Sequence, residues 1–282
     1  MKKRVAVTGG SGFIGKKIIK ELLKSGYKVI SLQRSSKKLV GVEIRHLNLS
    51  NVNSITRRMF SDIDVVIHAA ALVHNFKADV NAHRTLNFEA TNRLFKVCEE
   101  AEVEKFIFIS TVGVYGVYSS SKAISVQTKT CPVSPYAVAK LDSERMLLRS
   151  DSSTAISVIR LPLVYGENAP GNYGALERLA KSKLPLPFLN AKNKRSMVSA
   201  ELVAKVIKSA VASKKKYLGL HLLAEKKPYS TKEMIVKIRA QSGLTPMLFP
   251  VPGALMKFIL SAVGKRKIYE QLYEDLEFVS TI

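Results

Sequence analysis

Short apolar segments alternate with longer segments of helical periodicity over most of the chain. The short segments are bounded by glycine or polar residues and are too brief for core helices, so they predict buried strands. Strands are expected over 5–7, 27–32, 42–47, 64–68, 105–109, 155–161 and 217–222. Helices are expected over 16–24, 81–101, 134–149, 175–181, 200–212 and 231–241. This alternation predicts an α/β fold built on a doubly wound parallel sheet.

The alternation weakens near residue 165. Beyond it, the loop-like stretches 167–174 and 183–195 separate shorter helices. We therefore divide the chain into residues 1–165 and residues 166–282, the second part being partly interleaved with the first. The second part is smaller and rich in loops, which suits closure over a substrate.

The first predicted strand is followed by glycines at positions 9, 12 and 15, directly before a helix. Gly9 can adopt a positive φ and turn the chain tightly, and Gly12 has no Cβ to obstruct a pyrophosphate. Gly15 lets the helix pack close to the strand, and the helix start favours an anion. The segment therefore predicts a dinucleotide-phosphate site, with an ordinary strand–helix turn as the alternative.

The end of the second strand bears on the ribose of a bound cofactor. An acidic residue there binds a 2′-hydroxyl, whereas an arginine accommodates a 2′-phosphate. This chain has Gln33 and Arg34 at that place, followed by residues 35–38, and no acid. The local chemistry favours NADP over NAD, unless Arg34 is only a solvated loop charge. The small residues 69–71, after the fourth strand, leave room for a flat cofactor.

The composition fits a globular chain with a sizeable core, because 46% of the residues are apolar and 24% are charged. A net charge of +23 suits anionic ligands. It does not indicate nucleic acid, because the lysines are scattered and no basic tract dominates. Cys98 and Cys131 have neither metal nor disulfide spacing, so we expect no metal site and a reducing, cytoplasmic compartment.

Neither a secretion signal nor an integral membrane segment is expected. The apolar run after Met1–Arg4 is short and ends in glycines, and no stretch of about 18 uncharged apolar residues exists. The nearest candidate, residues 247–264, is interrupted by Pro250, Pro252 and Lys257. We expect it to form a helix packed on the smaller part, rather than a segment lying on a membrane surface.

Tyr136 and Lys140 are four residues apart in a predicted helix and therefore share one face. Ser110 and Thr111 end a strand, at the edge where a nicotinamide would lie. A phenol acting as a base near neutrality needs its pKa lowered from about 10 by roughly three units, or about 4 kcal/mol. Lys140 and an oxidised nicotinamide, both positive, supply the right sign. The Thr111 hydroxyl is expected to hold the substrate oxygen in line.

Taken together, these segments resemble the extended short-chain dehydrogenase/reductases, in particular the branch of nucleotide-sugar epimerases and dehydratases. The resemblance covers residues 4 to about 205, with its motifs in the family's order. It implies a Rossmann domain, bound NAD or NADP, a nucleoside-diphosphate sugar as substrate and a homodimer. The matching residues are Thr8–Gly15, His68–Ala70, Asn87–Thr91, Ser110–Gly116, Tyr136–Lys140 and Arg160–Gly166.

The resemblance also implies roles for individual residues. Tyr136 is expected to be the catalytic base or acid, Lys140 its partner and ribose ligand, and Thr111 the third member. Ser110 is the neighbouring alternative to Thr111. Arg195 matches an arginine that binds the diphosphate of the sugar nucleotide, unless it is a surface arginine in a basic loop. Expected cofactor contacts are Gly9, Ser11, Gly12, Phe13, Ile14, Gly15, Arg34, Asn48, Leu49, His68, Ala69, Ala70, Asn87, Tyr136, Lys140 and Pro162; expected substrate contacts are Thr111, Tyr136, Asn172 and Arg195.

Several positions depart from the family's pattern. Val112 and Gly113 stand where the sugar 4,6-dehydratases carry an acidic pair, so elimination of water is not expected. Asn48 replaces a frequent aspartate beside the adenine, and Arg34 replaces an acid. The segment after residue 275 is shorter than is common in the family, which leaves open a truncated edge of the substrate-binding part.

Two reactions at the sugar C4 remain open. An epimerase oxidises C4, rotates the 4-keto sugar and returns the hydride to the other face, whereas a reductase consumes NADPH on a preformed 4-keto sugar. Residues 160–195 resemble enzymes of surface-polysaccharide synthesis that act on UDP-N-acetylhexosamines. We expect the epimerase first and the 4-keto reductase of a UDP-linked deoxy-N-acetylhexosamine second. A non-catalytic NADP-sensing protein is the alternative of another class, which the presence of Tyr136 and Lys140 disfavours.

Overall fold

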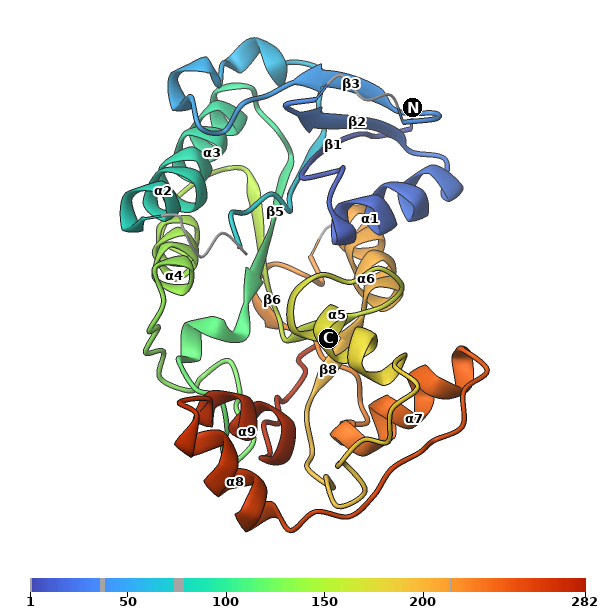
Figure 1. Ribbon diagram of the computed structural model, residues 1–282. Coiled ribbons are helices and arrows are strands. Elements are labelled where there is room, and N and C mark those ends of the chain that lie inside the picture. Colours follow the sequence, from blue (N-terminus) through green and yellow to red (C-terminus); the bar gives the residue numbers. More distant parts are fainter. Residues whose placement is uncertain (1, 36–38, 74–78, 214) are drawn as a thin grey trace.

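A sheet of seven strands, all paired in parallel, forms the centre of the protein in the computed structural model (Figure 1). The structure describes residues 2–35, 39–73, 79–213 and 215–282. The spatial order is β3-β2-β1-β4-β5-β6-β9, which is the Rossmann order 3-2-1-4-5-6 extended by one strand. The predicted doubly wound α/β fold is therefore confirmed. The strands are β1 (Arg4–Thr8), β2 (Lys28–Gln33), β3 (Glu43–His46), β4 (Val65–His68), β5 (Lys105–Thr111), β6 (Ala155–Leu161) and β9 (Gly219–Leu222).

Helices cover both faces of this sheet, and β5 shows why. Ile107 and Ile109 point to the face covered by α1 and α6, whereas Phe106 and Phe108 point to the face covered by α3 and α4. A strand that is apolar on both sides stays buried only when both faces are covered. The helices are α1 (Phe13–Lys24), α2 (Val80–Arg84), α3 (Ala90–Glu100), α4 (Pro135–Leu148), α5 (Gly171–Ala180), α6 (Ala200–Ala212), α7 (Thr231–Gln241), α8 (Gly253–Ala262) and α9 (Arg266–Tyr273).

The helix expected over 81–101 is interrupted. A π-helical segment, Thr85–Glu89, joins α2 to α3. The carbonyl of Asn87 accepts hydrogen bonds from the hydroxyls of Thr91 and Ser143, each at 2.8 Å. The predicted long helix is therefore present, and it contains a π-helical turn where side chains of α3 and α4 bond this carbonyl.

After residue 165 the chain builds a second core and then returns to the large sheet. The short strand β7 (Leu163–Tyr165) pairs in parallel with β8 (Met197–Ser199), and α5 and α7 pack beside them around Tyr173, Phe188 and Ile235. The chain then places α6 against α1 and adds β9 at the edge of the large sheet.

Residues 275–281 join several distant loops. The amide of Ser120 donates to the carbonyl of Asp275 at 2.8 Å, and the amide of Leu276 donates to the carbonyl of Lys194 at 2.8 Å. The amide of Thr281 donates to the carbonyl of Leu222 at 2.9 Å. This tail thus connects the loop after β5 with the segment that carries Arg195 and with β9.

The segment expected to pack as a helix on the smaller part forms α8, beside α9 at the lower end of the view in Figure 1. No residue of α8 is buried. The predicted helix is present, and its half-buried residues Gly253, Met256 and Leu260 pack on the protein, while another apolar side stays exposed. Among the described residues, no helix has the length and apolar content that a membrane crossing requires.

Candidate active site

The glycine segment has no room for side chains. Gly9 has a φ of +70°, and a Cβ on it would lie 2.7 Å from the amide nitrogen of Ala70. A Cβ on Gly15 would lie 2.1 Å from the carbonyl oxygen of Gly9. Gly12 caps α1 without a side-chain hydrogen bond, and the first turn of α1 contains no acidic residue. Because Ser11 and Gly12 are exposed, the helix start is accessible to an anion, which fits a dinucleotide pyrophosphate. Phe13 and Ile14 form the first turn and are half-buried.

The residues expected at the adenosine end lie after β2 and β3. Arg34 is exposed, whereas Gln33 is buried and donates from its side chain to the carbonyl of Ser35 at 2.8 Å. Residues 36–38, which the NADP interpretation also used, lie outside the described residues. The side-chain oxygen of Asn48 accepts from the amide of Ser50 at 3.1 Å. Leu49, which follows it, is half-buried against the core.

His68 lies inside the protein rather than at a cofactor surface. Its side chain is fully buried, with Nδ1 2.7 Å from the Thr8 hydroxyl and Nε2 2.9 Å from the Thr91 hydroxyl. Burial, aided by the charge of Lys140, lowers its pKa to about 3, so the ring is neutral. The expected cofactor contact of this side chain is therefore corrected: it braces the end of β4. The half-buried Ala69 and Ala70 follow it at the edge of the sheet.

Asn87 is also buried. Its side chain donates to the carbonyl of Leu72 at 3.1 Å and accepts from the amide of Leu72 at 2.8 Å. These two bonds occupy the amide, so the structure gives Asn87 the role of fixing the segment after β4, in place of the direct cofactor contact that we predicted. Pro162, between β6 and β7, is likewise buried.

The predicted catalytic side chains meet at the carboxyl end of β5. The Thr111 hydroxyl lies beside the Tyr136 phenol, close enough to lower its pKa. Thr111 also accepts from the amide of Gly113 at 3.0 Å, which fixes its rotamer. Tyr136 lies in the first turn of α4, where Ser134 caps the helix by accepting from the amide of Ala137 at 3.2 Å. The cap and Pro135 thus set the position of the phenol.

Lys140 lies one turn further along α4 and is 2% exposed. Its ammonium is 3.7 Å from the centroid of the Phe108 ring, a cation–π contact. Burial lowers its pKa to about 7, and the carboxylate of Glu144 opposes this by favouring the charged form. Lys140 is therefore a buried cation that titrates near neutrality.

Ser110 points away from Thr111, into a buried charged network. Its hydroxyl donates to Glu144, which also receives Nη2 of Arg160 at 2.6 Å. Nη1 of Arg160 donates to the Tyr115 hydroxyl at 2.8 Å. Glu144 and Arg160 are 1% and 3% exposed. Ser110 is therefore no substitute for Thr111 as a catalytic group. Sequence reasoning missed Glu144, although its place one turn after Lys140 on α4 was a usable signal.

The expected lowering of the Tyr136 pKa needs the charge of an oxidised nicotinamide as well as that of Lys140, and the protein without cofactor therefore does not test it. Without a bound cofactor this pKa lies above the ordinary value, because burial opposes the phenolate, and the Glu144 carboxylate acts in the same direction. The neighbouring Thr111 hydroxyl lowers it only in part. Lys140 thus does not by itself make Tyr136 a base at neutral pH, and the remaining positive charge has to come from a bound ligand.

Arg195 lies between the second core and the tail. Its Nη1 donates to the carbonyls of Tyr118, Glu270 and Glu274, at 3.2, 3.1 and 3.0 Å. Among the described residues, no carboxylate pairs with this guanidinium within 4.0 Å. Burial lowers its pKa to about 10, so the group stays charged at neutral pH. Asn172 is exposed in the first turn of α5.

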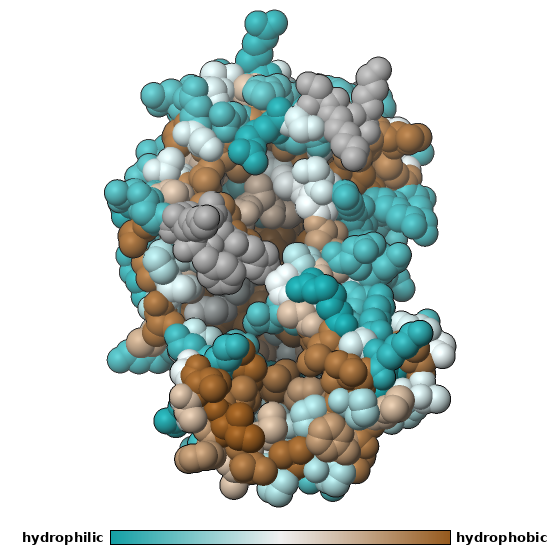
Figure 2. Space-filling model, viewed as in Figure 1, coloured by the Kyte–Doolittle hydropathy of each residue, from teal (hydrophilic) through white to brown (hydrophobic). Residues whose placement is uncertain are grey.

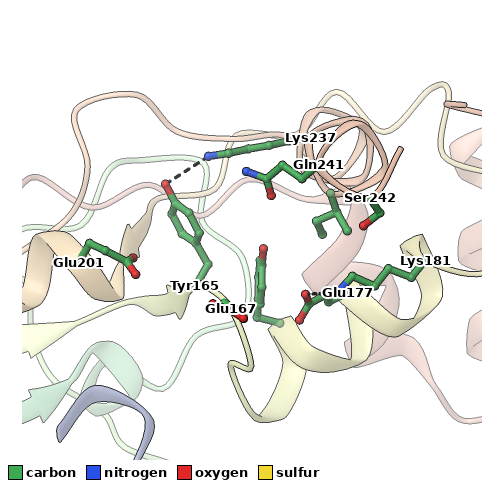
Figure 3. A pocket seen from close by; sticks show the side chains of 11 residues that line it. Tyr165, Glu167, Glu177, Lys181, Glu201, Lys237, Gln241 and Ser242 are labelled. Carbon is green, nitrogen blue, oxygen red and sulfur yellow. Dashed lines mark hydrogen bonds and ion pairs between the residues drawn. The ribbon is translucent and has the colours of Figure 1, made fainter. Parts of the chain in front are cut away.

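A separate pocket of about 360 Å³ lies between α5 and α7 (Figure 3). Lys237 reaches across it, with its ammonium 3.4 Å from the Tyr165 hydroxyl and 4.7 Å from the centroid of that ring. The Tyr165 hydroxyl also donates to Glu225 at 2.9 Å. None of the predicted catalytic residues lines this pocket, and these polar groups already bond one another.

Comparisons with known proteins agree with this geometry. The model of the NAD dependent epimerase/dehydratase family matches residues 5–217. A UDP-glucose 4-epimerase of Vibrio cholerae is 29% identical over 289 aligned residues, which cover 98% of this chain and 87% of that protein. A decarboxylating sterol-4-alpha-carboxylate 3-dehydrogenase of Dictyostelium discoideum is 36% identical, over 58% of this chain and 54% of that protein. The crystal structure of a UDP-N-acetylglucosamine 4-epimerase from Bacillus cereus has the same fold, with a TM-score of 0.79 at 21% identity, over 99% of this chain and 91% of that one.

The Rossmann strand order, the glycine segment and the Thr111–Tyr136–Lys140 cluster define an enzyme of the extended short-chain dehydrogenase/reductase type. Because the family model covers most of its length, the chain belongs to the NAD dependent epimerase/dehydratase family. This confirms the resemblance and the predicted nicotinamide dinucleotide cofactor. The roles of the individual site residues remain predictions.

Proposed function

We propose that this protein catalyses C4 epimerisation of a nucleoside-diphosphate sugar. The observation that carries the proposal is that Thr111 and Tyr136 lie side by side near the buried Lys140, at the carboxyl end of β5. Alignment of nearly the whole chain with a UDP-glucose 4-epimerase supports it. Val112 and Gly113 carry no carboxyl group, which argues against elimination of water at this site.

The chain's own residues handle the proton. A bound nicotinamide dinucleotide would accept the hydride from C4 and return it to the other face of the sugar. The glycine segment would hold the pyrophosphate, and Lys140 would hold the nicotinamide ribose. Thr111 orients the C4 hydroxyl, and Tyr136 takes its proton during oxidation and gives it back during reduction. The pKa of Tyr136 then has to fall, and the positive charges near it act in that direction.

The substrate class that we propose is a UDP-N-acetylhexosamine. Arg195, a partly buried cation with only carbonyls as hydrogen-bond acceptors, would bind the diphosphate, and Asn172 would contact the sugar nucleotide from the start of α5. Leu186 and Phe188 belong to residues 160–195, the segment whose resemblance suggested this substrate class. Both are buried in the second core, so we expect them to shape the site.

Turnover without added reductant tests the reaction. Desalted protein is incubated with UDP-N-acetylglucosamine, and with UDP-glucose in parallel, and the C4 epimer is measured by chromatography and proton NMR. We expect the epimer of UDP-N-acetylglucosamine, and about 10²–10⁴-fold slower turnover in Tyr136→Phe with cofactor affinity nearly unchanged. Tyr118→Phe serves as an aromatic control. Equal turnover in Tyr136→Phe would refute the assigned base.

Arg34 favours a second candidate, the NADPH-dependent 4-keto reductase. An exposed arginine after β2, with no acid beside it, suits a 2′-phosphate. Cofactor released from the purified protein and identified by mass spectrometry distinguishes the two. NAD that survives desalting supports the epimerase, whereas NADPH oxidation that requires a 4-keto sugar supports the reductase. Binding of NADPH without turnover of any sugar nucleotide would support a sensor.

The homodimer implied by the resemblance is also a proposal. The helix after Tyr136 exposes Val138 and Leu148, at 41% and 40% of their surfaces, on a helix that is otherwise packed against α3 and the sheet. Light scattering on the purified protein measures the mass, and a monomer at all concentrations would contradict this assembly.

A further inference from the structure

The helix α8 exposes an apolar surface at one end of the protein. Four residues form what we call the α8 patch: Leu255, Phe258, Ile259 and Val263 are 48%, 72%, 45% and 59% exposed. Their spacing of i, i+3, i+4 and i+8 places them on one face of the helix. Figure 2 shows apolar side chains gathered over α8 and α9, at the lower left of that view.

The α8 patch is not the face that packs on the protein. The half-buried positions of α8, Gly253, Met256 and Leu260, follow a spacing of three and four residues and therefore lie on a different side. Phe249 before the helix and Ile268 in α9 add exposed apolar surface, at 43% and 40%. Scattered exposed apolar residues are ordinary, but a contiguous group of this kind marks an interaction surface.

Positive charge surrounds the α8 patch. Between Met247 and Tyr269 the chain carries Lys257, Lys265, Arg266 and Lys267 and no acidic residue. All four are exposed. Lys257 lies next to Phe258 in sequence, so its long stem can lie along apolar surface with the ammonium in the polar layer. Lys265, Arg266 and Lys267 form a cluster just after the end of α8.

We propose that α8 and its following basic cluster dock on the surface of an anionic lipid bilayer. Exposed apolar side chains bordered by lysine and arginine are what a helix lying in the interface of an anionic membrane requires. The same charges disfavour a second copy of the chain as the occupant. A symmetric contact would bring two basic clusters together, in a protein whose net charge is +23.

The position of α8 suits this docking. The helix lies at the end of the protein opposite β3, with the catalytic strand β5 between them (Figure 1). A bilayer at that end meets α8 and α9 and leaves the strands that bind the adenosine end of a cofactor away from the surface. The proposal is independent of which sugar nucleotide the site takes.

Sedimentation with vesicles tests the proposal on the full chain. Vesicles of phosphatidylcholine and phosphatidylglycerol in equal amounts are compared with vesicles of phosphatidylcholine alone. We expect binding to the anionic vesicles, at least about tenfold weaker binding to the neutral ones, and release at about 1 M salt, where the Debye length is about 3 Å. Sedimentation with neither kind would overturn the proposal.

Two pairs of variants assign the binding to α8. We expect Leu255→Ser/Phe258→Ser to reduce affinity for the anionic vesicles at least about tenfold, and Val40→Ser/Val80→Ser, which removes exposed apolar groups elsewhere, to leave it unchanged. Lys265→Glu/Lys267→Glu should also weaken binding about tenfold, in contrast to Lys20→Glu/Lys24→Glu on α1, which alters the net charge equally.

Folding and self-association are measured in the same variants. Circular dichroism should show unchanged melting, because none of these side chains is buried. Vesicle binding that survives both α8 variants would overturn the proposal. A concentration-dependent mass in light scattering that Leu255→Ser/Phe258→Ser abolishes, without vesicle binding by the parent chain, would identify a second copy as the occupant instead.

Discussion

Helices α6 and α8 are both rich in apolar residues, but only α6 buries them. The helix α6 buries Val203, Ile207 and Val211, which recur every four residues, against α1 and the sheet. The helix α8 buries none of its residues. Both apolar segments form helices, as the sequence predicts. Whether an apolar side of such a helix is buried depends on whether another element of the fold packs against it. The apolar side of α6 packs against α1 and the sheet, whereas one apolar side of α8 has no such neighbour among the described residues and is exposed.

The largest expected difference between the two regions comes from removing one carboxylate in each. One variant changes the body of the protein, and the other changes the hairpin formed by α8 and α9. Glu144→Gln leaves the buried Arg160 without a charged partner, and we expect the free energy of unfolding to fall by about 3–5 kcal/mol. Glu270→Gln removes the partner of the exposed Arg266 and should cost less than about 1 kcal/mol. Urea unfolding followed by circular dichroism measures both. Similar losses in the two variants would contradict the contrast.

Truncating one isoleucine in each helix tests the comparison directly. Ile207→Ala in α6 creates a cavity under a fully buried side chain, and we expect a loss of about 2–5 kcal/mol. Ile259→Ala in α8 removes a side chain that is 45% exposed and should change stability by less than about 0.5 kcal/mol. The urea unfolding midpoints of the two variants, compared with that of the parent chain, measure both losses of stability. A large loss from Ile259→Ala would show that α8 is part of the core.

The buried Lys140 in the body of the protein should make the free energy of unfolding depend on pH. The pKa of Lys140 is about 7 in the folded, cofactor-free protein and 10.5 in the unfolded chain, so between these values the unfolded chain binds more protons. Stability should therefore rise with pH above 7, with a contribution from Lys140 of at most about 1.4 kcal/mol per pH unit.

The control compares the pH dependence of stability in the parent chain and in Lys140→Met. Lys140→Met should lose that contribution to the slope, and the difference between the two proteins removes the effect of Lys105, whose burial lowers its pKa in the same direction. An unchanged slope in Lys140→Met would mean that Lys140 is charged throughout this range.

The sequence was informative wherever a local pattern determines the structure. The strands, the glycine turn and the shared helix face of Tyr136 and Lys140 all depend on residues close together in the chain, and the structure has them where they were expected. Thr111 was placed correctly beside Tyr136 because parallel strands end at one edge of the sheet.

The sequence was less informative wherever a side chain's direction depends on distant neighbours. Ser110 and Thr111 are adjacent, but only the packing of β5 against α4 and β6 decides that Ser110 meets Glu144. His68 and Asn87 fit a cofactor edge by type, and their burial follows from Thr91 and Leu72. The bonds of residues 275–281 join segments far apart in the chain, which no local pattern indicates.

The hydrogen bonds of Arg195 have a mechanical consequence. One nitrogen of this guanidinium holds the carbonyls of Glu270 and Glu274, at the end of the hairpin that contains α8, and the carbonyl of Tyr118, a few residues beyond Thr111. The hairpin of α8 and α9 and the loop after β5 thus share one hydrogen-bond donor, in addition to other bonds such as that from the side chain of Asn193 to the carbonyl of Glu274. A displacement of the hairpin would therefore move two acceptors of the guanidinium that we propose as the ligand of the diphosphate.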